Sequence, residues 1–187
     1  MLRDVYLNAR VVDSGSYLTT VNELCDQSPA LRPELLQYVA GHLVAAVNLS
    51  RCTKLLTEEE KGATIATALS LRTGLPLAMA RQYPYAVSAH LINFTSEYSA
   101  GSLCVNGIEP GDVVCIVDDT LSTGGTIAAL VDAVQGSGAK VEAVAVVVEK
   151  VRNGGRQMLE QTRGVSVTSL LQIDVTCRGV TVLSGVA

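Results

Sequence analysis

The feature that most constrains the fold is an uninterrupted apolar run, Val113–Val117, which lies between a turn and a segment rich in glycine and hydroxyl residues. Five apolar residues without alternation are typical of a strand that is buried on both faces of a parallel sheet. A helix is predicted near Gly125–Gln135, and a second Val-rich strand at Val141–Val148. Strand, helix and strand with short turns form a βαβ unit, so the sequence predicts an α/β fold with a parallel sheet.

Further elements are expected on both sides of this unit. Pro33 and Glu34 favour a helix start, and this helix is expected to run to about Val47. A second apolar helix, near 63–72, ends at Gly74. The remaining expectations are strands at 75–80, 165–171 and 180–183, a helix at 155–161, a charged turn at 57–60 and irregular structure over 81–98.

Composition excludes several classes of function. The chain has 187 residues, which fits one domain, 1–187. Its aromatic residues are six Tyr, one Phe and no Trp, too few for the stacking platforms that single-stranded nucleic acids need. A net charge of −4 lacks the basic surface that binds a phosphate backbone. We therefore expect no nucleic-acid partner.

The sequence also indicates where the protein works. The least polar long stretch, Leu35–Ser50, contains Gln37, His42 and Asn48 and is too short and too polar to span a membrane. No signal peptide is visible, so no membrane partner is expected. Five scattered cysteines without a CxxC pair indicate reduced thiols, which predicts a cytoplasmic protein with neither a disulfide framework nor a zinc site.

The segment after the apolar run carries the chemistry. Asp118 and Asp119 come at its end, and Ser122–Thr126 forms a hydroxyl- and glycine-rich turn before the helix. Ligands of open α/β sheets bind at this edge, and a helix N-terminus with glycines can surround a phosphate. Carboxylates beside it suit vicinal hydroxyls, so the pattern favours a ribose 5-phosphate. The alternative is a pair of solvated acids followed by an ordinary turn. A P-loop is excluded because no Gly-Lys pair exists.

These residues resemble a known family. Residues 114–126 closely resemble the phosphoribosyl-pyrophosphate (PRPP) motif of type I phosphoribosyltransferases, although an aliphatic residue is more usual at Thr120. Glu59–Gly62 is similar to the family's pyrophosphate loop. The run Phe94–Gly101 resembles the Glu-Tyr segment of adenine and archaeal hypoxanthine enzymes, and residues 57–150 match well.

The resemblance implies an architecture and a set of roles. A parallel twisted sheet flanked by helices would form a core of about 33–150, with a small hood from about 1–32 and 150–187. Asp118 and Asp119 would hold the ribose hydroxyls, directly or through water on Mg²⁺, and would count with Glu97 as catalytic residues. The residues implied to bind PRPP are Glu60, Lys61, Gly62, Arg81, Asp118, Asp119, Thr120, Leu121, Ser122, Thr123, Gly124, Gly125 and Thr126.

Other roles implied by the resemblance concern the base. Glu97 would exchange a proton with the purine ring, and Tyr98 and Lys150 are weaker candidates for contacting it. Residues 82–98 would close over the site. Each assignment has a plainer alternative: Lys61 and Arg81 as surface charges, Glu97 as a solvated acid, and Lys150 as a solvent-facing lysine. Many family members have Arg-Lys where this chain has Arg81-Gln82, so one cation for the pyrophosphate is missing.

The implied activity is a purine phosphoribosyltransferase that transfers the 5-phosphoribosyl group of PRPP to hypoxanthine, guanine or adenine and releases pyrophosphate, with Mg²⁺ as cofactor, in purine salvage. The resemblance also implies a homodimer. An orotate or other pyrimidine enzyme is the alternative within this class. A catalytically silent PRPP sensor and a structural α/β subunit are the alternatives outside it.

Overall fold

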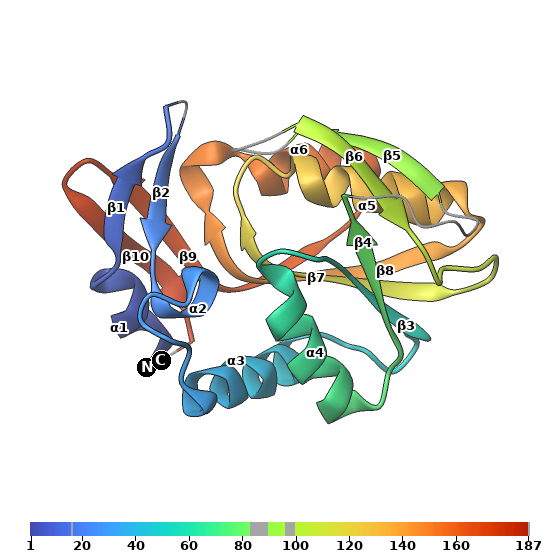
Figure 1. Ribbon diagram of the computed structural model, residues 1–187, viewed down its shortest axis with the longest axis horizontal. Coiled ribbons are helices and arrows are strands. Elements are labelled where there is room, and N and C mark those ends of the chain that lie inside the picture. Colours follow the sequence, from blue (N-terminus) through green and yellow to red (C-terminus); the bar gives the residue numbers. More distant parts are fainter. Residues whose placement is uncertain (16, 83–89, 96–99, 187) are drawn as a thin grey trace.

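The computed structural model describes residues 1–15, 17–82, 90–95 and 100–186. Eight strands form one mixed sheet in the order β10-β9-β8-β7-β3-β4-β6-β5 (Figure 1). From β9 to β4 neighbouring strands are parallel, whereas β10, β6 and β5 are antiparallel to their neighbours. The strands of this sheet are β3 Lys54–Glu58, β4 Leu77–Arg81, β5 His90–Thr95, β6 Ala100–Val105, β7 Val113–Leu121, β8 Lys140–Lys150, β9 Val167–Thr176 and β10 Gly179–Gly185.

Helices cover both faces of the sheet. In Figure 1, α3 and α4 lie on one side of β7 and β8, and α5 and α6 lie on the other. The predicted helices are all present, as α3 Pro33–Ala46, α4 Gly62–Thr73, α5 Gly125–Gly136 and α6 Gly155–Arg163. The predicted α/β fold with a parallel sheet flanked by helices is therefore confirmed.

Strand β7 contributes to two separate apolar cores. Cys115 and Val117 pack with residues of α3 and α4, whereas Val114 and Ile116 pack with residues of α5. Alternate side chains of a strand point to opposite faces of the sheet. Because both faces are covered, every residue of the apolar run except Val113 is buried, and this explains the absence of alternation in the sequence.

Two expectations about local structure were wrong. Thr57 and Glu58 were expected in a charged turn but belong to β3, whose buried Leu55 and Leu56 hold it between β4 and β7. The three consecutive glutamates concealed this short strand. The stretch expected to be irregular contains β5, which pairs with β6 at the edge of the sheet. Residues 83–89 and 96–99 lie outside the described residues.

The N-terminal segment, residues 1–32, forms small elements beside the last two strands of the chain. They are α1 Leu2–Leu7, β1 Arg10–Asp13, β2 Leu18–Val21 and α2 Glu23–Asp26. β1 and β2 form an antiparallel pair, α1 and β1 contact β10, and β2 contacts β9 (Figure 1). Asn22 caps α2, since its Oδ1 accepts hydrogen bonds from the N–H groups of Leu24 and Cys25.

All five cysteines are free, as their scattered positions predicted. No helix in the described part of the chain combines the length and apolar character needed to cross a membrane.

Candidate active site

The two acids of the motif lie near the carboxyl end of β7. The sequence predicted them at the carboxyl end of a buried strand, and β7 continues two residues beyond them to Leu121, because Thr120 and Leu121 still pair with β8. Asp118 is 8% exposed and Asp119 is 5% exposed. The strand is flanked by parallel strands on both sides, so both carboxylates lie at the ligand-binding edge of the sheet.

The two carboxylates influence each other. Asp118 Oδ1 accepts a hydrogen bond of 2.9 Å from the Asp119 N–H, and the Thr120 hydroxyl donates to Asp119 Oδ2 at 3.0 Å. Burial, and next the charge of Asp119, raise the pKa of Asp118 well above its ordinary value. This acid pair therefore binds a proton more readily than free carboxylates do, and a cation or hydroxyl donors beside it would stabilise its charged form.

The loop after β7 leads into an uncapped helix. Gly124 adopts a left-handed conformation with φ of 85°, and α5 begins without a side-chain cap. The first N–H groups of such a helix are available to an anion. The loop is held from behind, because Asn153 donates to Ser122 Oγ at 2.7 Å and the Gly155 N–H donates to the Ser122 carbonyl at 3.1 Å. A Cβ at Gly155 would collide with that carbonyl.

The turn between β3 and α4, residues 59–61, lies beside the acid pair. Gly62 begins α4, and a Cβ there would collide with Thr57 Oγ1 and lie 2.8 Å from Asp118 Oδ1. Only glycine allows this close approach. Lys61 forms an ion pair of 2.7 Å with Asp26 of α2.

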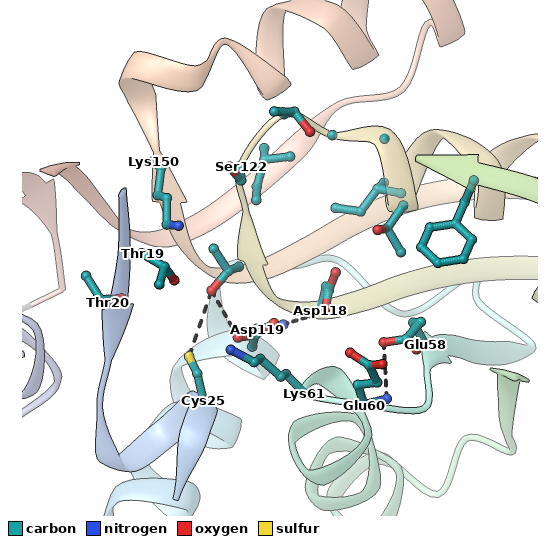
Figure 2. A pocket seen from close by; sticks show the side chains of 18 of the residues that line it. Thr19, Thr20, Cys25, Glu58, Glu60, Lys61, Asp118, Asp119, Ser122 and Lys150 are labelled. Atoms are coloured by element: carbon teal, nitrogen blue, oxygen red, sulfur yellow. Dashed lines mark hydrogen bonds between the residues drawn. The ribbon is translucent and has the colours of Figure 1, made fainter. Parts of the chain in front are cut away.

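These segments surround one pocket (Figure 2). The predicted residues that line it are Glu60, Lys61, Asp118, Asp119, Thr120, Leu121, Ser122, Thr123, Gly124, Gly125, Thr126 and Lys150. Gly62 and Arg81 are not among them, and the Arg81 Nε lies 3.9 Å from a Glu59 oxygen. Gln82 lines the pocket and donates to Glu60 Oε1 at 3.0 Å. Glu97 and Tyr98 lie outside the described residues.

Sequence reasoning missed several lining residues, namely Thr19, Thr20, Cys25, Glu58 and Ile127. Gln82 and Phe94 also line the pocket and belong to the segment 82–98 that was expected near the site. Thr19 and Thr20 lie on β2 and Cys25 on α2, so they reach the pocket only through tertiary packing. The fourth of these residues, Glu58, had a signal, since it is an additional acid directly before the recognised loop. The suggestion that Lys150 faces solvent was wrong: this lysine is 3% exposed and donates to the Leu18 carbonyl at 3.2 Å.

Glu58 has an unusual environment. Burial raises the pKa of this carboxyl to about 7, and the charges of Glu60, Glu59 and Asp119 act in the same direction. Its Oε2 accepts a hydrogen bond from the Glu60 N–H, while Oε1 is buried without a hydrogen-bond partner in the described structure. The pocket therefore carries a concentration of acidic groups at its β3 side.

Comparisons with known proteins agree with this geometry. No family model matches the chain. The hypoxanthine/guanine phosphoribosyltransferase of Methanocaldococcus jannaschii is 34% identical over 184 residues, which cover 98% of this chain and 100% of that protein. The enzyme of the same name from Methanosarcina acetivorans is 36% identical over 180 residues, covering 96% of this chain and 93% of that protein.

Solved structures show the same fold. The adenine phosphoribosyltransferase of Rhodothermus marinus superposes with a TM-score of 0.75 at 26% identity, covering 91% of this chain and 97% of that one. The enzyme from Giardia lamblia, solved in complex with 9-deazaadenine, gives a TM-score of 0.77 at 18% identity, with coverage of 91% and 97%. At that identity the likeness concerns the fold alone. The resemblance seen in the sequence is thus confirmed, and the chain belongs to the type I phosphoribosyltransferase family, among its purine phosphoribosyltransferases.

Proposed function

We propose that this protein transfers the 5-phosphoribosyl group of PRPP to a 6-oxopurine, hypoxanthine or guanine, and releases pyrophosphate. The observation that carries the proposal is one pocket that joins a buried acid pair, a glycine-rich loop and an uncapped helix N-terminus. Relatives named hypoxanthine/guanine phosphoribosyltransferase, matched over nearly the whole chain, support it.

The sugar phosphate would occupy the motif side of the pocket. The N–H groups at the start of α5 and the hydroxyls of Ser122, Thr123 and Thr126 would hold the 5′-phosphate. Asp118 and Asp119 would accept hydrogen bonds from the ribose 2′- and 3′-hydroxyls. This division follows the chemistry of the groups, because N–H and hydroxyl donors suit a phosphate and carboxylates suit hydroxyls.

The pyrophosphate would lie at the turn between β3 and α4. Backbone N–H groups of Glu60, Lys61 and Gly62 are the proposed donors, as in the pyrophosphate loop that this turn resembles. The Glu60 N–H would have to leave Glu58 Oε2, to which it donates in this structure. A role for Arg81 requires its guanidinium to leave Glu59 and turn toward the pocket. Gln82 supplies neutral amide donors at the position where the resemblance implies a cation.

The residues fit a Mg²⁺ ion that is bound together with PRPP. Within the described residues no group of three or more His, Cys, Asp or Glu side chains could hold a metal alone. Mg²⁺ is commonly bound by one or two carboxylates plus substrate phosphates, and an acidic pocket for an anionic substrate needs such a cation. Asp118 and Asp119 would hold it, directly or through water. When bound, Mg²⁺ offsets the negative charge that develops on the departing pyrophosphate.

The chain needs no nucleophile of its own. The bond between C1′ and the pyrophosphate oxygen breaks, a ring nitrogen of the purine bonds to C1′, and the base loses one proton. The carboxylates would hold the ribose while positive charge develops at C1′, and the loop donors would fix the phosphate. We propose Glu97 as the acceptor of the base proton and residues 82–98 as the segment that excludes water.

Lys150 supports a 6-oxopurine over adenine. Its ammonium group has only donors, and it lines the pocket next to β2. A donor there matches the 6-oxo oxygen of hypoxanthine or guanine, whereas the 6-amino group of adenine would face it with another donor. The five free thiols fit a reducing compartment, so we also propose a cytoplasmic enzyme, and by family resemblance a homodimer.

The test is a competition among bases. The purified protein is incubated with PRPP, Mg²⁺ and an equimolar mixture of hypoxanthine, guanine, adenine and orotate, and the nucleotides are separated by chromatography. We expect inosine and guanosine monophosphates to dominate. A dominant adenosine or orotidine product would contradict the assignment of the base, and no product from any base would favour a PRPP sensor.

A further inference from the structure

The short helix α2 contacts two separate parts of the proposed PRPP site. Cys25 Sγ lies 3.8 Å from Thr120 Oγ1 on β7, and the neighbouring Asp26 pairs with Lys61 on the turn before α4. Figure 2 shows Cys25 and Lys61 on the same side of the pocket as Asp119. Two consecutive residues of the N-terminal segment therefore join the ribose side of the pocket to its pyrophosphate side.

On the ribose side these contacts form a continuous chain. The Tyr6 hydroxyl lies 3.2 Å from Cys25 Sγ, Cys25 contacts Thr120, and Thr120 donates to Asp119 Oδ2 at 3.0 Å. Tyr6 is fully buried and Cys25 is 5% exposed. Burial is the main cause that raises the pKa of both groups well above their ordinary values, so both keep their protons at neutral pH.

The direction of the chain follows from its last member. At that end the Thr120 hydroxyl donates its proton to Asp119 Oδ2. Its oxygen can then accept from the Cys25 thiol, whose sulfur can accept from the Tyr6 hydroxyl. Hydrogen bonds that run in one direction strengthen one another in a buried site. The chain thus holds the Oδ2 oxygen of Asp119 in place.

Thr120 is the member on which this chain depends. It occupies the motif position where an aliphatic residue is more usual, and an aliphatic side chain could neither donate to Asp119 nor accept from Cys25. The Thr120 side chain is half-buried and lines the pocket. Of its two partners, Asp119 lies on β7 and Cys25 lies on α2.

We propose that Thr120 and Cys25 are positioning residues that orient the Asp119 carboxylate toward the ribose of PRPP, with Tyr6 supporting them from α1. This inference rests on the proposed function, because it concerns how that same site holds PRPP. The N-terminal segment accordingly contributes to PRPP affinity without touching PRPP through these residues.

The test separates binding from turnover. Thr120→Val removes the hydroxyl at nearly constant volume and should raise the KM for PRPP about tenfold, with kcat changed less than about twofold. Thr120→Ser keeps the hydroxyl and should restore the wild-type KM. Cys25→Ala should raise this KM about threefold, because Cys25 acts on Asp119 only through Thr120. Tyr6→Phe should raise it less, because Tyr6 acts through both Cys25 and Thr120 and each added hydrogen bond is weak.

Cys115→Ala is the matched control, since it removes a fully buried thiol from the same strand without a contact to Asp119. It should lower the melting temperature and leave the KM for PRPP unchanged. A wild-type KM in Thr120→Val, a serine variant as impaired as the valine variant, or an equal KM rise in Cys115→Ala would overturn the inference.

A failure of the proposed function gives a different result. If the wild-type protein forms no nucleotide with any base, the dissociation constant of PRPP with Mg²⁺ is measured by calorimetry for the same variants. A graded loss of affinity would then support the positioning role in a PRPP-binding protein. No binding by the wild type would overturn both proposals. If Thr120→Val does not fold, the KM values for PRPP of Cys25→Ala and Cys115→Ala are compared instead. A rise in Cys25→Ala alone supports the inference, and equal values overturn it.

Discussion

The motif segment, residues 113–136, and the N-terminal segment, residues 1–32, reach the same pocket by different routes. The motif segment supplies a contiguous run of lining residues on one strand, one loop and one helix start. Among its described residues, the N-terminal segment supplies the adjacent pair Thr19 and Thr20 and the separate residue Cys25. The lining residues of the motif segment are neighbours in sequence, whereas those of the N-terminal segment reach the pocket only through tertiary packing.

The contacts made by the N-terminal segment show what the second route adds. Leu18, Cys25 and Asp26 reach Lys150, Thr120 and Lys61 across 132, 95 and 35 residues of sequence. Each contact ends on a side chain of the proposed site and none ends on the glycine-rich loop. We therefore expect the motif segment to set PRPP binding and the N-terminal segment to adjust it and to influence the choice of base.

The largest effect is expected from a substitution in the motif segment, at Asp119. Asp119→Asn keeps the shape of the side chain but removes its charge and one pair of acceptor sites. We expect kcat/KM for PRPP to fall about a hundredfold, by the same factor whichever purine is the partner. Steady-state assays with two bases measure this. Unchanged turnover would contradict the proposal that Asp119 holds the ribose. A loss of activity with only one of the two bases would indicate that Asp119 contacts the base instead.

A smaller effect is expected at Lys150, whose contact with the N-terminal segment we connect with the choice of base. Lys150→Met keeps the apolar stem and removes the ammonium group, which is buried near β2. We expect kcat/KM for hypoxanthine to fall about thirtyfold while that for adenine does not fall. The KM for PRPP should stay the same. Equal losses for both bases would contradict a contact between Lys150 and the 6-oxo oxygen.

The smallest effect concerns Glu58, which belongs to neither segment. Its folded-state pKa of about 7 exceeds the ordinary 4.5, so the folded state binds this proton more tightly and stability is lost as pH rises from about 4.5 to 7. Because Glu58 is only partly buried, solvent screening reduces the effect, and we expect about 1–2 kcal/mol. Asp118 contributes with the same sign, because its pKa is also raised.

Glu58→Gln should therefore flatten, without abolishing, the fall in the free energy of unfolding between pH 5 and pH 8. Urea denaturation at several pH values measures it. A variant with the wild-type pH dependence would mean that Glu58 is ionised throughout this range.

The two segments also explain how much the sequence could predict. The strongest signals lie within fourteen consecutive residues, namely Val113–Val117, the two acids and Ser122–Thr126. The sheet, α5 and most of the pocket lining could therefore be predicted from local patterns. Cys25 carries no local signal, because its part in the pocket depends on Thr120, which lies far away in sequence. β3 was missed since its charged end masked two buried leucines, and Lys150 was misjudged since burial of a lysine depends on Leu18 of β2.

One measurement tests the central claim most directly. Hypoxanthine consumption, inosine monophosphate formation and pyrophosphate release are followed together in a single reaction of the purified protein with PRPP and Mg²⁺. The three amounts should change in equal proportion, and all should stop when PRPP is omitted. Pyrophosphate release without nucleotide, or no change in any of the three with hypoxanthine or guanine, would contradict the assignment of a 6-oxopurine phosphoribosyltransferase.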